Sequence, residues 1–224
     1  MKTTILLAIG IALAAVTPSS QAALQVVNGD FTSGITDVNQ GDVADPWYDA
    51  NPANFWEAAW HINHDQPLMS DGYTPLVIFS ASELGGVYLY QNIGVRSEAE
   101  VALPLSFELG SFRDTADIRS GALTISIFQS DSFVGANDVD VATSGATLID
   151  SAVVTTGDLN PGDSVLRSAT LNLASANLTD PLFLHFDMAG EWIGMDNVQI
   201  VPEPSTFAIV GLGLAVLAVR RRRL

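Results

Sequence analysis

The residues best suited to binding a ligand lie in one aromatic stretch, DPWYDANPANFWEAAWHINHD, at positions 45–65. This stretch holds three of the four tryptophans, together with tyrosine, aspartate, asparagine and glutamate side chains. Aromatic faces beside a few polar groups suit sugars, because the rings cover the C–H face while the polar groups bind hydroxyls. We therefore expect carbohydrate binding here, and the candidate residues are Trp47, Tyr48, Trp56 and Trp60.

The same aromatic residues have a structural alternative. Tryptophans in a loop packed over the end of a β-sandwich can serve as core. Trp56 and Trp60 are four residues apart, which also suits packing on one face of a helical turn over 54–60. Trp47 and Tyr48 follow a proline, and we expect these two to be the more exposed pair.

Other candidates for metal binding or catalysis are weaker. The stretch 37–42 alternates oxygen ligands but departs from the EF-hand pattern, so a solvated turn explains it better. His61 and His64 lack the third histidine nearby that a zinc site would need. The sequence contains no G-x-S-x-G, H-E-x-x-H, phosphate-binding loop or dinucleotide-binding turn. We therefore predict a protein that is not an enzyme.

The charge distribution excludes some partners and favours others. The formal net charge is -16 at pH 7, and the segment from Asp30 to Glu203 contains all 25 acidic residues but only four basic ones. A segment this acidic repels the phosphate backbone of nucleic acids, and we therefore expect no nucleic-acid partner. Hard cations such as Ca²⁺ suit its oxygen ligands. Because there is no cysteine, the fold must depend on a hydrophobic core rather than on disulfides.

Short runs that alternate apolar and polar residues must form the elements that position these side chains. Turn-forming glycine, proline, asparagine and aspartate separate the runs. Roughly eight or nine short strands without a long amphipathic helix predict an all-β fold, an antiparallel β-sandwich or jelly roll. Residues 33–72 are the exception, a long polar and aromatic loop region. The expected strands cover 24–27, 75–80, 86–93, 100–109, 122–129, 146–154, 164–173, 182–188 and 192–201.

Residues 1–22 have the pattern of a signal peptide. Lys2 supplies the positive charge, residues 5–16 form a short apolar segment, and Ala22 ends a Ser-Gln-Ala site of the kind that signal peptidase reads. We expect cleavage after Ala22, which leaves the sandwich domain at 23–201. An uncleaved anchor helix is the alternative, and the shortness of the apolar run argues against it.

Residues 202–224 combine three features. Pro202-Glu203-Pro204 cannot continue a strand or a helix, since proline fixes φ and lacks an N–H. Residues 205–219 predict a transmembrane helix of about 22 Å, which can cross a bilayer that thins locally. The positive-inside rule then places the final basic cluster in the cytoplasm. This cluster comprises Arg220, Arg221, Arg222 and Arg223.

This order of features resembles the PEP-CTERM sorting signal of Gram-negative bacteria, and the resemblance covers residues 201–224. It implies processing by an exosortase near the PEP motif, after a transient stage in the inner membrane. It also implies delivery to the cell surface or to the extracellular polysaccharide and biofilm matrix. A plain C-terminal anchor is the alternative, but an anchor alone does not require the Pro-Glu-Pro.

The body resembles the galactose-binding-like jelly roll of many carbohydrate-binding modules. The matching pieces are VVNGDF at 26–31, VYLYQNI at 87–93 and IGMDNVQIV at 193–201. The resemblance implies neighbouring first and last strands, with a structural Ca²⁺ between them. Asp30, Asp196 and the backbone carbonyl of Asn28 would then be its ligands. Alternatively, both aspartates hydrogen-bond turn amides.

These observations lead to an exported, non-catalytic jelly-roll protein that binds extracellular polysaccharide. One alternative is a purely structural matrix protein that responds to calcium. Another is a polysaccharide-degrading enzyme, because among 25 acidic residues some pair of carboxylates will lie close together.

Overall fold

The computed structural model describes residues 23–31, 47–49, 58–60, 77–79, 87–111, 120–136, 139–190 and 193–201. Within these ranges, ten strands and one short 3-10 helix form. The strands are β1 (Tyr48–Asp49), β2 (Ala58–Trp60), β3 (Val77–Phe79), β4 (Val87–Gly94), β5 (Ala102–Ser111), β6 (Gly121–Gln129), β7 (Thr147–Thr155), β8 (Ser164–Asn172), β9 (Leu182–Gly190) and β10 (Ile193–Ile200), and the helix is η1 (Val141–Thr143).

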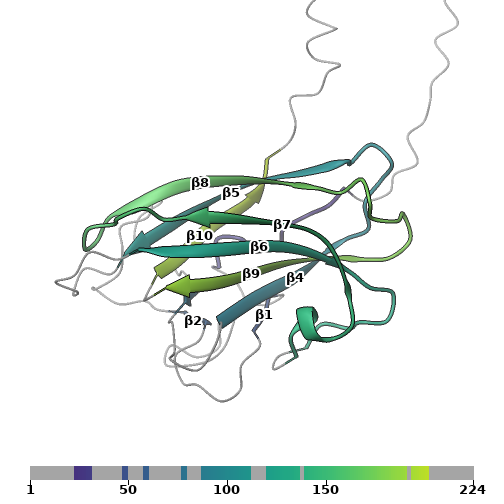
Figure 1. Ribbon diagram of the computed structural model, residues 1–224, viewed down its shortest axis with the longest axis horizontal. Coiled ribbons are helices and arrows are strands. Elements are labelled where there is room, and N and C mark those ends of the chain that lie inside the picture. The colour runs from purple at the N-terminus through teal and green to yellow at the C-terminus, as the bar shows by residue number, and fades with distance from the viewer. Residues whose placement is uncertain are drawn as a thin grey trace, which may run out of the picture.

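The strands lie in two layers (Figure 1), and neighbouring strands are antiparallel. Sheet A has the order β1-β4-β9-β6-β7, and sheet B has the order β2-β3-β10-β5-β8. Among these strands only β2 and β3, and β6 and β7, follow each other within one sheet; every other pair of consecutive strands lies in different sheets. The predicted antiparallel sandwich is therefore confirmed.

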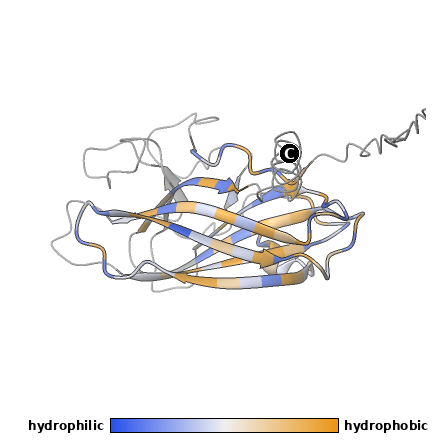
Figure 2. Cartoon of the chain, turned by 90° about the horizontal axis from the view of Figure 1, so that it is seen from above, coloured by the Kyte–Doolittle hydropathy of each residue, from blue (hydrophilic) through white to orange (hydrophobic). Residues whose placement is uncertain are grey.

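The hydrophobic core fills the space between the sheets, because alternate side chains of each strand point to the same face. Figure 2 shows the resulting changes between hydrophobic and hydrophilic residues along the strands. The inward faces predicted for three strands are confirmed, since these side chains are at most 1% exposed. They are Leu103, Leu105, Phe107 and Leu109 of β5, Leu123, Ile125 and Ile127 of β6, and Leu182, Leu184 and Phe186 of β9.

The first described segment, residues 23–31, lies beside β4 without forming the strand expected at 24–27. The backbone N–H of Gln25 donates to the carbonyl of Ile93 at 3.0 Å. The buried side-chain amide of Gln91 then bonds both the N–H and the carbonyl of Val27, each at 2.8 Å. The Gln91 side chain thus replaces the backbone of β4 as the partner of Val27. Backbone pairing between this segment and β4 is therefore limited to the bond between Gln25 and Ile93.

Part of the aromatic stretch is extended rather than helical. Residues 58–60 form β2, which pairs with β3 and places Trp60 opposite Val77. The expected helical turn over 54–60 is therefore wrong for these residues, because backbone pairing with β3 outweighs a weak local preference. Trp56 lies outside the described residues.

Both predicted targeting segments also lie outside the described residues. They include Ala22, the Pro202-Glu203-Pro204 motif, the apolar segment 205–219 and the arginines 220–223. Within the part of the chain that the structure describes, no helix has the length and apolar character of a membrane span.

Candidate functional site

Trp47 is a core residue, contrary to the expectation that it is exposed. Its side chain is only 2% exposed, and its ring lies 5.4 Å from that of Phe31 and 6.0 Å from that of Phe186. Its indole N–H donates to the carbonyl of Asn28 at 3.0 Å. Alternation along the extended chain explains the error, since Trp47 points inward and the next residue, Tyr48, points outward. A ring buried in this way cannot stack on a sugar.

Tyr48 lies on the outer face of sheet A, the side that faces away from the core. It is opposite Tyr90 in the β1–β4 pair, and the two rings stack with centroids 5.4 Å apart. A Cβ added at Gly135 would collide with the ring of Tyr48. The segment between β6 and β7, described at 130–136 and 139–146 and here named the η1 loop, therefore packs closely against Tyr48.

The η1 loop is fastened over an aromatic cluster on this outer face. The hydroxyl of Tyr90 donates to the carbonyl of Ala136 at 2.6 Å and accepts the N–H of the same residue at 3.1 Å. Phe133 of the loop contacts the rings of Tyr90 and Phe183. Val141 of η1 is completely buried in the same cluster. The η1 loop, which runs from β6 to β7 in Figure 1, therefore covers these aromatic side chains.

Next to this cluster, the outer face becomes more polar. Cross-strand register brings residues from four strands into two rows, because directly paired residues share a face. Tyr88, Asp187 and Thr124 are half-buried, whereas Ser151 and Val153 are exposed. The first row is Tyr88, Asp187, Thr124 and Val153, and the second is Tyr90, His185, Ser126 and Ser151, in the order β4, β9, β6, β7.

An ionisable group lies at the centre of these rows. His185 is 4% exposed, and its ring stacks on that of Tyr88 at 5.6 Å. Its Nε2 lies 3.4 Å from Oδ1 of Asp140 in the η1 loop. The geometry is not that of a hydrogen bond, and among the described residues Nε2 has no hydrogen-bond partner. The two groups therefore form an ion pair only when the imidazole is protonated.

Asp187 is held in a partly desolvated position beside this pair. Burial raises the pKa of its carboxyl above the ordinary value of 3.8. The nearby His185 lowers the pKa, and the carboxylate of Asp140 raises it further. The outer face thus offers an aromatic ring, hydroxyl groups and a carboxylate with a perturbed pKa on rigid strands, an arrangement that suits hydrogen bonding to a hydroxyl-rich ligand.

The two edge motifs, VVNGDF and DNVQIV, meet as expected. Gly29 accepts a hydrogen bond from the N–H of Val198 at 2.9 Å, and a Cβ on Gly29 would collide with the carbonyl of Val198. Asn28 and Asp30 line a polar pocket of about 350 Å³ at this junction. Asp196 is completely buried nearby, and its Oδ1 accepts the N–H of Asn197 at 2.7 Å, which is the alternative predicted for it.

A calcium ion at this junction could not use the carbonyl of Asn28. That carbonyl already accepts the indole N–H of Trp47 and, at 3.1 Å, the backbone N–H of Phe31. A carbonyl oxygen has two lone pairs, so both are taken. Among the described residues, no group of three or more histidine, aspartate or glutamate side chains could hold a metal ion. The carboxylates of Asp30 and Asp196 are oxygen ligands of the type that calcium takes.

Sequence reasoning missed Tyr88, His185 and Asp187. A signal for them exists in LFLHFDM at 182–188, where Phe183, His185 and Asp187 alternate with the core residues. In such a strand, the apolar face packs in the core. The aromatic and ionisable groups of the other face then contact either a covering segment or a ligand. The pairing of β9 with β4, which brings Tyr88 beside these residues, has no local sequence signal.

Solved structures share the two-layer architecture. A cyclase from Fischerella sp. TAU is 14% identical over 82% of this chain and 98% of its own, with a TM-score of 0.53. At that identity the likeness shows the fold alone. It also means that the fold by itself does not distinguish an enzyme from a binding module.

Structural neighbours also include carbohydrate-binding module β-sandwiches. The CBM22-1-GH10 modules of the Clostridium thermocellum N-terminal endo-1,4-beta-D-xylanase 10B, complexed with xylohexaose, are 13% identical over 82% of this chain and 29% of that chain (TM-score 0.45). The family 11 module from Clostridium thermocellum, in complex with a beta-1,3-1,4-mixed-linked tetrasaccharide, is 14% identical over 80% of this chain and 96% of that chain (TM-score 0.41). These scores are too low to assign a ligand to this chain.

The C-terminal segment gives the most specific comparison. No curated protein matches the sequence. Residues 201–223, however, match the PEP-CTERM protein-sorting motif, as the order of proline, apolar segment and arginines predicts. The chain therefore carries a PEP-CTERM sorting motif, which indicates an exported protein that is anchored in a membrane and then released.

Proposed function

We propose that this protein is a non-catalytic polysaccharide-binding protein that is sorted to the cell surface or extracellular matrix through its PEP-CTERM tail. The observation that carries the proposal is the outer face of sheet A. There the half-exposed ring of Tyr88 lies beside the carboxylate of Asp187 and the hydroxyls of Thr124 and Ser151. An aromatic ring among hydroxyls and a carboxylate is the combination that hydroxyl-rich ligands require.

The dimensions of this face favour a chain over a single sugar. Four strands spaced by about 4.8 Å make a row of roughly 14 Å across the sheet. Beyond that row, the η1 loop rises over the aromatic cluster and forms a side wall. The formal net charge of the protein is -16 at pH 7, so a neutral polysaccharide suits it better than a polyuronate.

The sorting tail supplies the biological setting of the proposal. Signal peptidase would act after Ala22, and an exosortase would act at the Pro202-Glu203-Pro204 motif. The body would then be released at the surface of a Gram-negative cell, where extracellular polysaccharide and biofilm matrix are the available ligands. Acidic composition is compatible with a matrix environment rich in divalent cations.

The direct test is capture of the domain 23–201 on immobilised polysaccharides, both with calcium and with a chelator. Xylan, mixed-linked β-glucan and cellulose are the neutral probes, and alginate and polygalacturonate are the anionic ones. We expect saturable binding to at least one neutral polymer and weaker binding to the polyuronates. A domain that melts cooperatively but binds none of them would refute the proposal and favour a structural matrix protein. Release of reducing sugar would instead identify an enzyme.

We also propose that calcium stabilises the junction of the two edge motifs through Asp30 and Asp196. The pocket that Asn28, Asp30 and Asn197 line provides the space. Asp30 lies in its wall, Asp196 is buried next to Asn197, and both carboxylates are hard oxygen donors. Calcium that binds only the folded state must raise its melting temperature as the concentration increases. Asp30→Asn should reduce that rise, measured for each variant as the difference between its melting temperatures in calcium and in chelator. A melting temperature that is the same in calcium and in chelator would exclude a structural ion.

A further inference from the structure

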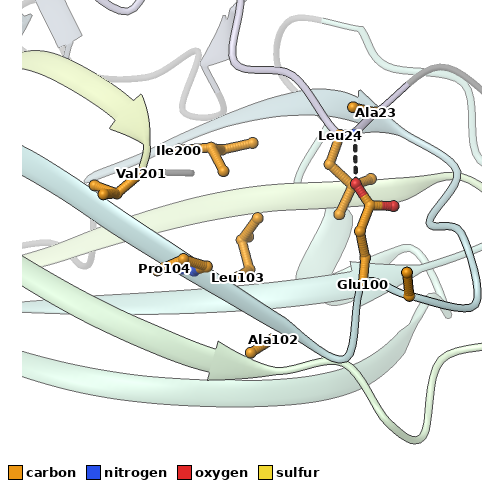
Figure 3. A pocket seen from close by; sticks show the side chains of 9 residues that line it. Ala23, Leu24, Glu100, Ala102, Leu103, Pro104, Ile200 and Val201 are labelled. Carbon is orange, nitrogen blue, oxygen red and sulfur yellow. Dashed lines mark hydrogen bonds between the residues drawn. The ribbon is translucent and has the colours of Figure 1, made fainter. Parts of the chain in front are cut away.

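A pocket of about 320 Å³ lies where the two ends of the described domain meet (Figure 3). Residues 23–24 form one side of it, residues 200–201 form the other, and residues 102–104 at the start of β5 form its floor. Glu100 is the one polar residue among those that line it. The pocket is therefore an apolar hollow with a single carboxylate at its edge.

The walls of this pocket are fixed by hydrogen bonds. Oε1 of Glu100 accepts the backbone N–H of Leu24 at 3.1 Å, and its Oε2 accepts the N–H of Ser97 at 2.6 Å. On the other side, the N–H of Val201 donates to the carbonyl of Pro104 at 2.8 Å. Both ends of the domain are thus tied to the segment around the start of β5, and the pocket is preformed.

The sorting motif begins in the wall of this pocket. Val201 lines the pocket and is also the first residue that matches the PEP-CTERM motif. No linker separates the sheet from the motif, because Pro202 follows Val201 directly. A protease that binds the motif as an extended peptide must therefore also meet this end of the folded domain. Val101 and Val201, 55% and 42% exposed, add apolar surface beside it.

We propose that this pocket is a docking site for the membrane protease that processes the PEP-CTERM tail, and that it receives an apolar side chain of that enzyme. Apolar lining, a preformed shape and direct continuity with the motif are what such a contact requires. The motif and the folded domain are then recognised together, so an unfolded chain is a poor substrate. The inference rests on the proposed sorting of the protein but not on its binding of polysaccharide.

The test follows processing of the full chain in a bacterium that processes PEP-CTERM proteins, by pulse-chase and change in size. Ala102→Arg places a charged side chain in the pocket floor and should slow processing by roughly tenfold, as for a charge placed in an apolar contact. The matched control is Asn160→Arg. Gly162, in the same turn, bonds Ser111 at the far end of β5, about 30 Å from Ala102 along a ten-residue strand. Equal rates for the two variants, both with wild-type melting temperatures, would overturn the proposal.

A second variant leaves the pocket intact. A four-residue Gly-Ser insertion between Val201 and Pro202 separates the motif from the pocket, and we expect it to slow processing. Faster processing would mean that the folded domain only obstructs the protease. Unchanged processing would mean that the domain makes no contact that affects the rate. Either result would overturn the proposal. Replacing Pro202 and Pro204 by alanine is the control for sorting itself. If that change leaves processing intact, the motif is not the signal, and both sorting and docking are refuted while polysaccharide binding remains open.

Discussion

The outer faces of the two sheets differ, although their inner faces are alike. Sheet A carries tyrosine, histidine, phenylalanine and aspartate on its outer side, partly covered by the η1 loop. The outward positions of β5, β8 and β10 within the described chain hold no aromatic residue. They are mainly small or polar, such as Ser106 and Ser168, with Leu166 exposed opposite the buried Glu108.

This difference separates the residues that specify the fold from those that specify a ligand. Both sheets need the same inward alternation, because either face of a sandwich core must be apolar. Nothing in the fold demands aromatic and ionisable residues on the outer side of one sheet alone. Substitutions that unfold the shared core should therefore damage both faces, whereas substitutions on one outer face should change only that face.

The largest effect should come from Phe186→Ala. Phe186 of sheet A contacts Trp47 at 6.0 Å and Phe107 of sheet B at 6.2 Å, so its ring joins the two layers. Its removal should lower the free energy of unfolding by about 3–5 kcal/mol through the cavity that it leaves. Denaturant unfolding measures this, with Leu166→Ala, 70% exposed on sheet B, as the control. A loss below about 1 kcal/mol would contradict the packing described here.

Trp47→Phe should have an intermediate effect on stability and none on polysaccharide binding. The change keeps an aromatic ring in the core but removes the N–H that donates to the carbonyl of Asn28. We expect a loss of about 1–2 kcal/mol in the free energy of unfolding. Affinity for a captured polysaccharide should stay the same wherever the variant remains folded. A selective loss of affinity would restore Trp47 as a ligand-binding residue.

Asp187→Asn should produce the smallest effect, and its sign depends on pH. Because burial raises the pKa of Asp187 in the folded state, folding favours the protonated carboxyl. That stability is fully present below 3.8 and is lost as the pH rises through the raised pKa. Asparagine resembles the protonated form, so the variant should be more stable at pH 7, by less than about 1 kcal/mol since the group is half-exposed.

Melting temperatures between pH 3 and pH 8 test this assignment. The difference between Asp187→Asn and the wild type should vanish below the ordinary carboxyl pKa. Asp158→Asn, at an exposed position between β7 and β8, is the control and should change little across the range. A variant that is less stable at pH 7 would mean that the charged form of Asp187 contributes a stabilising contact.

The sequence alone predicts most of the sandwich, because inward alternation is a local signal. The inward residues of β5, β6 and β9 follow directly from it. The inward position of Trp47 depends instead on how the adjacent β1 pairs with β4, and that of residues 58–60 on pairing with β3. No local pattern contains that information. The same is true of the cluster of Tyr88, His185 and Asp187, which forms only because β4 and β9 are neighbours. The sorting motif is predictable because consecutive residues define it.

The most direct test of the account compares affinities for a captured neutral polysaccharide after one substitution on each outer face. Tyr88→Ala removes the half-buried ring from sheet A, and Leu166→Ala removes an exposed side chain from sheet B. We predict that Tyr88→Ala weakens binding by roughly tenfold or more, as for loss of one aromatic anchor, while Leu166→Ala binds like the wild type. Equal affinities for both variants, with unchanged melting temperatures, would contradict the assignment of the binding face to sheet A.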